Sequence, residues 1–248
     1  MGAAVLSAEP RPAFYALAPG GWRDYVTLLH PPYTLWHLSY VAIGAGLAPH
    51  LEARRLLVAL AAFFLAVGIG AHALDEVNGH PLRTQISDRV LIVLAAVSIA
   101  GAVALGVAAS FLYTLWLVPL VAAGAFIVCA YNLELFGGMF HSDTWFAVAW
   151  GSFPLVAAYL AVAERITVEA LLAAVFAGFL SLAQRHLSTQ VRSMRRRVAA
   201  VDGTIELLDG GREPVTPETL TAAPEAALRA LTLAVTTLAA SLLVLRLG

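Results

Sequence analysis

The sequence predicts an all-α fold, a polytopic transmembrane bundle of about seven helices, from its composition and from the length of its apolar blocks. Of the 248 residues, 60% are hydrophobic and only 12% are charged, whereas about a quarter of the residues of a soluble domain are charged. The apolar residues fall in blocks of roughly twenty, the length that a helix needs to cross a hydrocarbon core of about 30 Å. The blocks show no alternating barrel pattern, and lipid tolerates no unpaired backbone groups, so helices are the predicted spanning elements.

Seven candidate spans follow one another along the chain. They cover residues 33–50, 56–75, 89–110, 112–133, 144–163, 168–190 and 226–246. Residues 1–32 are predicted to form an N-terminal interfacial segment ahead of a bundle over 33–246. Residues 191–225, with several Gly and Pro turn signals, are predicted as a cytoplasmic loop or small hairpin before the last helix. This loop is either a lid over the cytoplasmic face or a plain connector.

Three counts exclude whole classes of function. The net charge is −1, so no long-range attraction to nucleic acid is expected. All fifteen basic residues are arginines, which excludes a Schiff-base lysine and a phosphate-binding Walker lysine. The single cysteine, Cys129, excludes an intramolecular disulfide and a thiolate-cluster metal site.

Arginines are distributed unequally between the two predicted faces. If the N-terminus is cytoplasmic, eleven arginines fall in the inner segments and four in the outer ones. Cytoplasmic segments of membrane proteins carry an excess of positive charge, so this orientation fits the positive-inside rule. The arginine run at residues 195–197 follows the sixth span. It is either a topology anchor beside anionic headgroups or a part of the site.

In the same orientation, most of the histidines fall on the cytoplasmic face. Six of the seven fall at or near cytoplasmic helix ends, namely His30, His37, His72, His80, His141 and His186. Most of the carboxylates near helix ends lie at the same face, whereas the outer connections are short and carry few such groups. We therefore predict that the functional site lies at the cytoplasmic face of an integral membrane protein.

Helical spacing makes this prediction more specific. On the second span, His72 lies three residues before Asp75 and four before Glu76, so the three share one helix face. His80 follows the turn signal Asn78-Gly79, which is predicted to fold it back over the helix end.

Further polar groups end the fourth and sixth spans. The fourth span ends in Tyr131-Asn132 and Glu134, and a Gly-Gly link leads from there to His141. On the sixth span, His186 and Gln190 are again four residues apart, so they share a helix face.

Imidazole nitrogens and carboxylate oxygens on facing helices are the ligands of a divalent ion inside a bundle. Neutral histidine favours Fe or Zn over Mg, which prefers oxygen. The predicted metal ligands are His72, Asp75, Glu76, His80, Glu134, His141 and His186. The alternative is that these are ordinary interfacial residues and solvated helix ends. The gathering of six histidines on one side favours a site.

Five short motifs follow one another along the chain, and their order carries a family resemblance. They are residues 30–35 (HPPYTL), 72–75 (HALD), 80–87 (HPLRTQIS), 131–132 (YN) and 151–159 (GSFPLVAAY). In this order they resemble the UbiA superfamily of intramembrane aromatic prenyltransferases. The resemblance covers residues 30–200. It implies a helical bundle with a cytoplasm-facing pocket, Asp-rich motifs after the second and sixth helices, and an isoprenoid or other lipid substrate.

The sequence departs from that family at its Asp-rich motifs. In the first motif, NDxxDxxxD, Ala71-His72 replace Asn-Asp, Asp75 keeps the middle acid and Gly79 stands at the last one; the second motif, residues 184–190 (QRHLSTQ), contains no acid. The family's aspartates hold Mg against a diphosphate leaving group. Their replacement by His and Gln favours a borderline metal and a chemistry other than ordinary Mg-diphosphate transfer. Typical UbiA-like folds also have nine helices, whereas this sequence supports about seven.

Three functions remain open at this point. The first is a metal-dependent enzyme acting on an isoprenoid or other lipid, or as a variant a His-rich di-iron oxidoreductase. Its predicted catalytic residues are Glu76, Tyr131 and Arg192, and its predicted substrate-binding residues are His30, His37, Asn132 and Gln190. The second is a Mg-dependent prenyltransferase with degenerate motifs, and the third is a non-enzymatic metal or lipid binding or transport protein. Transport ranks last because the spans are predicted to be unbroken, with their polar groups at one end.

Overall fold

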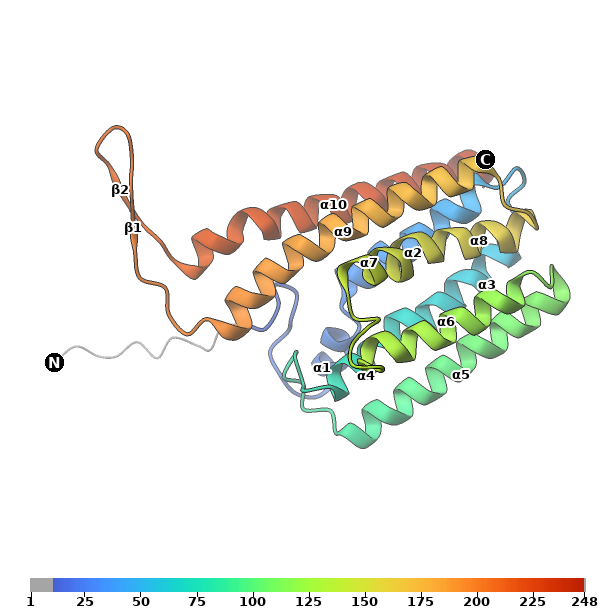
Figure 1. Ribbon diagram of the computed structural model, residues 1–248, viewed down its shortest axis with the longest axis horizontal. Helices are drawn as coiled ribbons and strands as arrows, with labels where there is room; N and C mark the ends of the chain where they lie inside the picture. The colour runs from blue at the N-terminus through green and yellow to red at the C-terminus, as the bar shows by residue number, and fades with distance from the viewer. Residues whose placement is uncertain (1–10, 248) are drawn as a thin grey trace.

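The computed structural model describes residues 11–247 and shows long helices packed side by side along one direction (Figure 1). The first ten residues of the predicted N-terminal segment lie outside the described residues. The elements in chain order are α1 (Trp22–Leu28), α2 (Pro31–Leu47), α3 (Ala53–Phe63), η1 (Phe64–Ala71), α4 (His72–Val77), α5 (Asp88–Leu112), α6 (Leu117–Asn132), α7 (Asp143–Phe146), η2 (Ala147–Ser152), α8 (Phe153–Ala163), α9 (Val168–Arg197), β1 (Thr204–Glu206), β2 (Arg212–Pro214) and α10 (Pro217–Leu247). The segments η1 and η2 are π-helical and join the α-helices on either side into continuous helices.

Five of these continuous helices are long and apolar enough to cross a membrane by length and composition. They are Ala53–Val77, Asp88–Leu112, Asp143–Ala163, Val168–Arg197 and Pro217–Arg246. The apolar helix α6 is shorter, with 16 residues, and α2 has 17. Each of the seven predicted spans overlaps one of these helices. The five long helices indicate an integral membrane protein, and the number of seven crossings stays a prediction.

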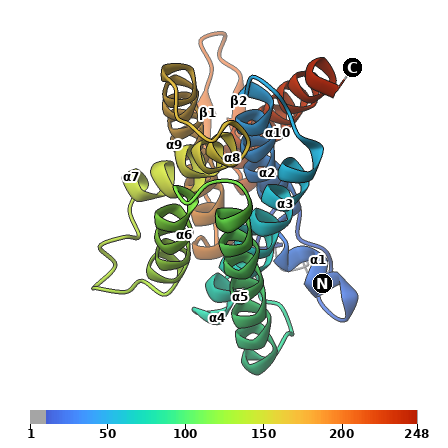
Figure 2. The same cartoon turned by 90° about the vertical axis from the view of Figure 1, so that its right-hand side faces the viewer.

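The helix formed by α7, η2 and α8 lies at the centre of the bundle. Viewed along the bundle, α2, α3, α6 and α9 surround α8 (Figure 2). Its span has the largest buried share of the five, 56%. Two glycines allow close approach of its neighbours: a Cβ at Gly44 on α2 would collide with the carbonyl of Leu155, and one at Gly151 would lie 2.6 Å from the carbonyl oxygen of Ala177 on α9. Small residues at such crossings are the usual means by which membrane helices pack closely.

Most of the non-helical chain gathers at one end of the bundle. Residues 11–30, 78–87, 133–142 and 198–216 connect or precede helices there, and we call this the loop-rich end. At the opposite, far end, the connections are short, at 48–52, 113–116 and 164–167. Two buried carboxylates, those of Asp24 and Glu76, bind the backbone of the loop-rich end. Asp24 accepts hydrogen bonds from the backbone N–H groups of Gly20 and Gln85, which ties the N-terminal segment to the loop 78–87.

The polar stretch between α9 and α10 contains a short antiparallel hairpin, in which Ile205 pairs with Glu213. The hairpin projects away from the helices and does not lie over the end of the bundle (Figure 1). The arginine run before it is engaged by other parts of the chain. Arg195 forms an ion pair with Glu225 of α10 at 2.6 Å, and Nε of Arg196 donates to the carbonyl of Pro12 at 3.2 Å.

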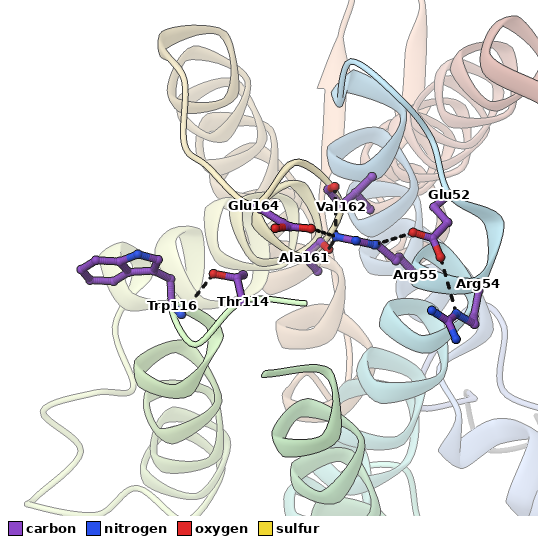
Figure 3. Close-up of polar contacts among 8 residues, drawn as sticks. All are labelled: Glu52, Arg54, Arg55, Thr114, Trp116, Ala161, Val162 and Glu164. Carbon is purple, nitrogen blue, oxygen red and sulfur yellow. Dashed lines mark hydrogen bonds and ion pairs between the residues drawn. The ribbon is translucent and has the colours of Figure 1, made fainter. Parts of the chain in front are cut away.

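At the far end, one arginine holds three segments together (Figure 3). Arg55 at the start of α3 donates to Glu52 at 2.6 Å and to Glu164 at 2.7 Å, and also to the carbonyls of Ala161 and Val162. Those two carbonyls belong to the last turn of α8, where the helix leaves carbonyl groups without an intrahelical partner. The guanidinium of Arg55 also lies 4.4 Å from the ring centre of Tyr113. We call this arrangement the Arg55 clamp.

Candidate functional site

A polar cavity of about 100 Å³ lies at the loop-rich end between α2, α4, α6, η2 and α9. Eight of the predicted site residues line it: His30, His37, His72, Asp75, Tyr131, Asn132, His141 and Arg192. The remaining lining residues are Pro12, Ala13, Phe14, Tyr15, Tyr33, Val67, Ala71, Phe146, Trp150, Gln184, Arg185, Ser188 and Val191. Segments that are distant in the sequence thus supply one continuous site.

Residues 11–17, which we call the N-terminal strap, form one wall of this cavity. Besides the bond from Arg196 to Pro12, the guanidinium of Arg229 on α10 lies 5.1 Å from the ring centre of Phe14. The backbone N–H of Leu17 donates to the hydroxyl of Thr27 at 3.0 Å. The strap is therefore fixed to α1, α9 and α10, and it covers the site in the position where the sequence suggested the 191–225 loop.

Three cavity histidines have the same hydrogen-bonding pattern. Nδ1 lies 2.9 Å from the carbonyl oxygen of Trp150 in His37, 3.1 Å from that of Gly68 in His72 and 3.1 Å from that of Tyr131 in His141. A carbonyl oxygen only accepts hydrogen bonds, so Nδ1 carries the proton in each ring. In the neutral ring, Nε2 then carries the lone pair. This is the arrangement found around metal-binding and general-base histidines, whose orientation is fixed through the other nitrogen.

The two π-helical segments supply two of those carbonyls. Gly68 belongs to η1 and Trp150 to η2. A π-helix bonds residue i to i+5 and disturbs the regular i to i+4 ladder, and such segments are frequent at functional sites. The distortions in the two central helices therefore coincide with the backbone groups that orient His72 and His37.

His30 is held in an unusual conformation at the start of α2. Its backbone is left-handed, with φ 45° and ψ 59°, which is uncommon for a residue with a side chain. Its Nδ1 lies 2.8 Å from the hydroxyl of Tyr15, and its ring stacks on that of His72 with centres 4.1 Å apart. Nε2 of His30 and Oε1 of Gln184 are buried atoms with no hydrogen-bond partner among the described residues. Buried polar atoms are rarely left unpaired, so both suit a polar ligand group in the cavity.

Burial lowers the pKa of His30 well below its ordinary value, and the nearby His72, Arg196 and Arg192 lower it further. The unfolded chain therefore takes up a proton near pH 6.5 whereas the folded protein does not. Folding stability linked to His30 is present above that pH and is lost as the pH falls toward the folded-state pKa, by at most about 1.4 kcal/mol per pH unit. We expect the melting temperature in detergent to fall between pH 7.5 and 5.5 less steeply in His30→Gln than in wild type. Equal slopes would contradict this assignment.

A second polar group links α6, α7 and α9. Arg185 donates to the hydroxyl of Tyr131 at 2.5 Å and to the carboxylate of Asp143 at 2.6 Å. The ring of Tyr131 stacks on that of His141, with centres 4.5 Å apart. Because the hydroxyl of Tyr131 accepts from Arg185, its own proton remains available to a group in the cavity. Tyr131 and His141 are thereby held in fixed positions at the wall.

The remaining predicted cavity residues are Asp75, Arg192 and Asn132. Asp75 lies one turn after His72 and makes no hydrogen bond among the described residues, so its carboxylate is free to interact with a ligand. One nitrogen of Arg192 donates to the hydroxyl of Thr189 at 3.2 Å, one turn earlier on α9. The side-chain amide of Asn132 donates to the carbonyl of Val128 at 2.7 Å, and its side-chain oxygen remains an acceptor.

Five predicted site residues do not line the cavity. Glu76 is fully buried and accepts hydrogen bonds from the N–H groups of Leu82 and Thr84 and from the Thr84 hydroxyl, all at 2.9 Å. His80 is bonded to Asp88 at 2.8 Å, and this bond raises the pKa of His80. Glu134, His186 and Gln190 are exposed, and Glu134 approaches His141 only to 3.9 Å.

Sequence reasoning identified only Arg192 on the face of α9 that forms the wall. The prediction also chose His186 and Gln190, whereas the buried face carries Gln184, Ser188 and Val191. Residues two apart on a helix point about 200° apart, so the predicted pair faces away from the cavity. A stripe of small residues earlier on α9, at Ala170, Ala174, Ala177 and Ser181, continues into Gln184 and Ser188. That stripe is the signal that identifies the inward face.

Among residues 11–247, no group of three or more His, Cys, Asp and Glu side chains is close enough together to hold a metal ion. Comparison with known proteins also gave no assignment: no family model, no curated protein and no solved structure matches this chain. The resemblance to the UbiA superfamily and the predicted metal therefore stay predictions.

Proposed function

We propose that the polar cavity is the active site of an intramembrane enzyme, related to the UbiA superfamily, that acts on the polar head of an isoprenoid or another membrane lipid. The observation that carries this proposal is the gathering of four histidines, Asp75 and Tyr131 around one cavity at the end of a membrane bundle. Ionisable groups at such a position are costly in a membrane protein and are usually retained for function. The face that holds the cavity is proposed to be cytoplasmic, from the distribution of arginines.

The residues have distinct roles in this proposal. His37, His72 and His141 offer Nε2 lone pairs as proton acceptors, and the hydroxyl of Tyr131 offers a proton. Arg185 and Arg192 orient an anionic or polar headgroup. Glu76 is a positioning residue, since its carboxylate is occupied by the loop 78–87.

The donor chemistry of the cavity suits Fe or Zn better than Mg. Histidines whose second nitrogen is bonded to a carbonyl are typical ligands of such metals. His72, Asp75 and His141 line the cavity without converging on one point, so a divalent metal would draw them together by changes of side-chain rotamer, and it would supply Lewis-acid activation of the lipid head. A di-iron centre would need about six to eight His and carboxylate ligands. The cavity lining contains five such residues, which disfavours the di-iron variant.

The function is tested on the full chain purified in detergent, by elemental analysis and by mass spectrometry of the co-purified lipid. We expect about stoichiometric Fe or Zn, and one class of bound lipid, in wild type. Both are expected to fall at least tenfold in His72→Ala. The matched controls are His80→Ala and His186→Ala, which change histidines outside the cavity and are expected to retain both. Equal loss in His72→Ala and the controls, or absence of metal and lipid from wild type, would contradict the proposal.

A Mg-dependent prenyltransferase is the second candidate, because Asp75 lies in the same cavity as Arg185 and Arg192. Carboxylates hold Mg and arginines bind diphosphate oxygens, so these groups suit a prenyl diphosphate. With Glu76 engaged elsewhere, Asp75 alone would contribute a carboxylate from this helix. Thermal stabilisation by a prenyl diphosphate that requires Mg and disappears in Asp75→Asn would favour this candidate over the first.

A further inference from the structure

The hairpin between α9 and α10 stands apart from the helices and is fixed at its base (Figure 1). At that base, Arg195 of α9 forms its ion pair with Glu225 of α10, and the N–H of Val215 donates to the carbonyl of Gly203 at 3.0 Å. Beyond the base, β1 and β2 form a sheet of two strands. A two-stranded hairpin is at best marginally stable in water by itself. A third strand would therefore stabilise it.

The two faces of the hairpin differ in polarity. Residues paired across an antiparallel sheet lie on the same face, so Ile205 shares one face with Glu213, and Glu206 shares the other with Arg212. Leu207, two positions after Ile205, adds a second large apolar side chain to the first face. Both are exposed, Ile205 to 50%. The apolar face of the hairpin is therefore left open by the part of the chain that the structure describes.

The two edges of the hairpin also differ, because only one of them is suited to pair with a further strand. The N–H of Leu207 donates to the carbonyl of Gly211 at 2.8 Å, so the backbone of Leu207 is directed toward the partner strand. Inward and outward directions alternate along a strand, so the backbone groups of Thr204 and Glu206 are directed outward from β1. On β2, the outward position Pro214 has no N–H to donate, and proline at an edge obstructs strand addition. The edge of β1 is thus the open one.

The charge of the hairpin decides which kind of strand fits this edge. Residues 201–216 contain one arginine and four carboxylates, all exposed, namely Asp202, Glu206, Asp209 and Glu213. The hairpin of a second copy would bring like charges together, which destabilises a pair of strands, whereas a strand with lysines or arginines is attracted. Successive side chains of an added strand meet the Glu206 face and the Ile205 face in turn. A strand in which basic and apolar residues alternate therefore fits both faces.

We propose that the edge of β1 is a docking site for an extended segment of another protein in which basic and apolar residues alternate. The segment pairs with the backbone of Thr204 and Glu206 as a third strand. Its apolar side chains cover Ile205 and Leu207, and its basic side chains lie beside the carboxylates. The docking site lies outside the polar cavity, so it recruits a partner to the protein and takes no part in the chemistry of the cavity. In the orientation proposed above, the partner is cytoplasmic.

The probe for this site is a seven-residue peptide in which lysine and valine alternate, added to the full chain in a neutral detergent. Its control is an isomer with the same residues in two blocks, which keeps the charge and loses the alternation. Binding is measured by fluorescence anisotropy, and hydrogen exchange is measured residue by residue by mass spectrometry. We expect the alternating peptide to bind at least tenfold more tightly than the isomer. It is expected to slow exchange of the N–H groups of Thr204 and Glu206 and to leave the outward N–H of Arg212, on the other edge, unchanged.

Two substitutions at one position separate pairing at the edge from loss of the hairpin. Thr204→Pro removes an outward N–H and is expected to weaken binding of the alternating peptide at least tenfold, whereas Thr204→Val keeps that N–H and is expected to retain binding. Glu206→Gln is expected to weaken binding and to reduce its dependence on salt. Exchange of the inward N–H of Val215, which is bonded to Gly203, reports whether the hairpin persists in each variant. If Thr204→Pro loses the hairpin, the exchange of Thr204 and Arg212 in wild type decides by itself.

Equal binding of the two peptides, or equal protection of Thr204 and Arg212, would overturn this inference. Slow exchange at Thr204 that appears without peptide and increases with protein concentration would overturn it as well, because a second copy would then occupy the edge. None of these results would affect the proposed function, which is decided by the metal and lipid retained in His72→Ala and His80→Ala.

Discussion

Glu76→Ala is expected to destabilise the folded protein by about 3–5 kcal/mol, because it leaves buried donors without an acceptor. The carboxylate is completely inaccessible and accepts three hydrogen bonds from Leu82 and Thr84. Two of those donors are backbone N–H groups in the loop 78–87, which has no regular secondary structure to satisfy them. The loss is measured as a lower melting temperature in detergent and as faster proteolysis of the loop.

The neighbouring acid provides the control. Asp75 makes no hydrogen bond among the described residues and lines the polar cavity, so Asp75→Asn is expected to change stability by less than about 1 kcal/mol. The same variant is expected to lose bound metal, whereas Glu76→Gln is expected to retain it. Glu76→Gln keeps an oxygen for Thr84 but places an amide nitrogen against the N–H of Leu82, so an intermediate loss of stability is expected. Similar stability of Glu76→Ala and Asp75→Asn would show that the loop does not depend on Glu76.

Arg55→Met is expected to destabilise the protein by about 2–4 kcal/mol, since it removes the charge that joins α3 to the end of α8. The substitution leaves Glu164 without its cation, Glu52 with only the 3.5 Å contact to Arg54, and the carbonyls of Ala161 and Val162 without the Arg55 donor (Figure 3). The effect is measured by thermal unfolding, in detergent at low and high salt. Because Arg55 is largely shielded, with 17% of its side chain exposed, most of the loss is expected to persist at high salt.

Arg54 is the matched control for the Arg55 clamp. It is the same residue type one position earlier, its side chain is 70% exposed, and it contacts Glu52 only at 3.5 Å. Exposed ion pairs of this kind contribute little, so Arg54→Met is expected to change stability by less than about 0.5 kcal/mol. Equal effects of the two substitutions would indicate that the stabilisation is general charge balance at the far end and not the clamp.

Much of the fold could be predicted because the length of an apolar stretch can be read directly from consecutive residues. The predicted span 56–75 corresponds to the helix Ala53–Val77, and the predicted span 89–110 to α5. The π-helical segments were not predicted, because η1 and η2 contain ordinary apolar residues. Whether such residues form i to i+4 or i to i+5 hydrogen bonds depends on how they pack against neighbouring helices. The N-terminal strap was also not predicted as a wall of the site, since its contacts come from Arg196 and Arg229, far away in the sequence.

The site was predicted where residue type and helix-end position sufficed, and missed where the direction of the side chain mattered. His72 and Asp75, predicted to share one helix face, line the same cavity. Glu76, one residue later, points into the loop 78–87, and no spacing rule distinguishes these two directions. On α9, the spacing of the small residues indicates which face points inward. His186 was chosen because it is a histidine, without regard to that spacing.

The strap also has a consequence for the order in which the protein is made. Pro12 leaves the ribosome 184 residues before Arg196, to which it is bound in the finished protein, and Phe14 precedes its partner Arg229 by more. Synthesis proceeds from the N-terminus, and early segments fold before late ones exist. The strap can therefore bond to Thr27 and His30 early in synthesis, whereas its bonds to α9 and α10 form only after those helices have been made. The wall of the polar cavity is thus fastened in two stages, and the last contacts are those made by the C-terminal helices.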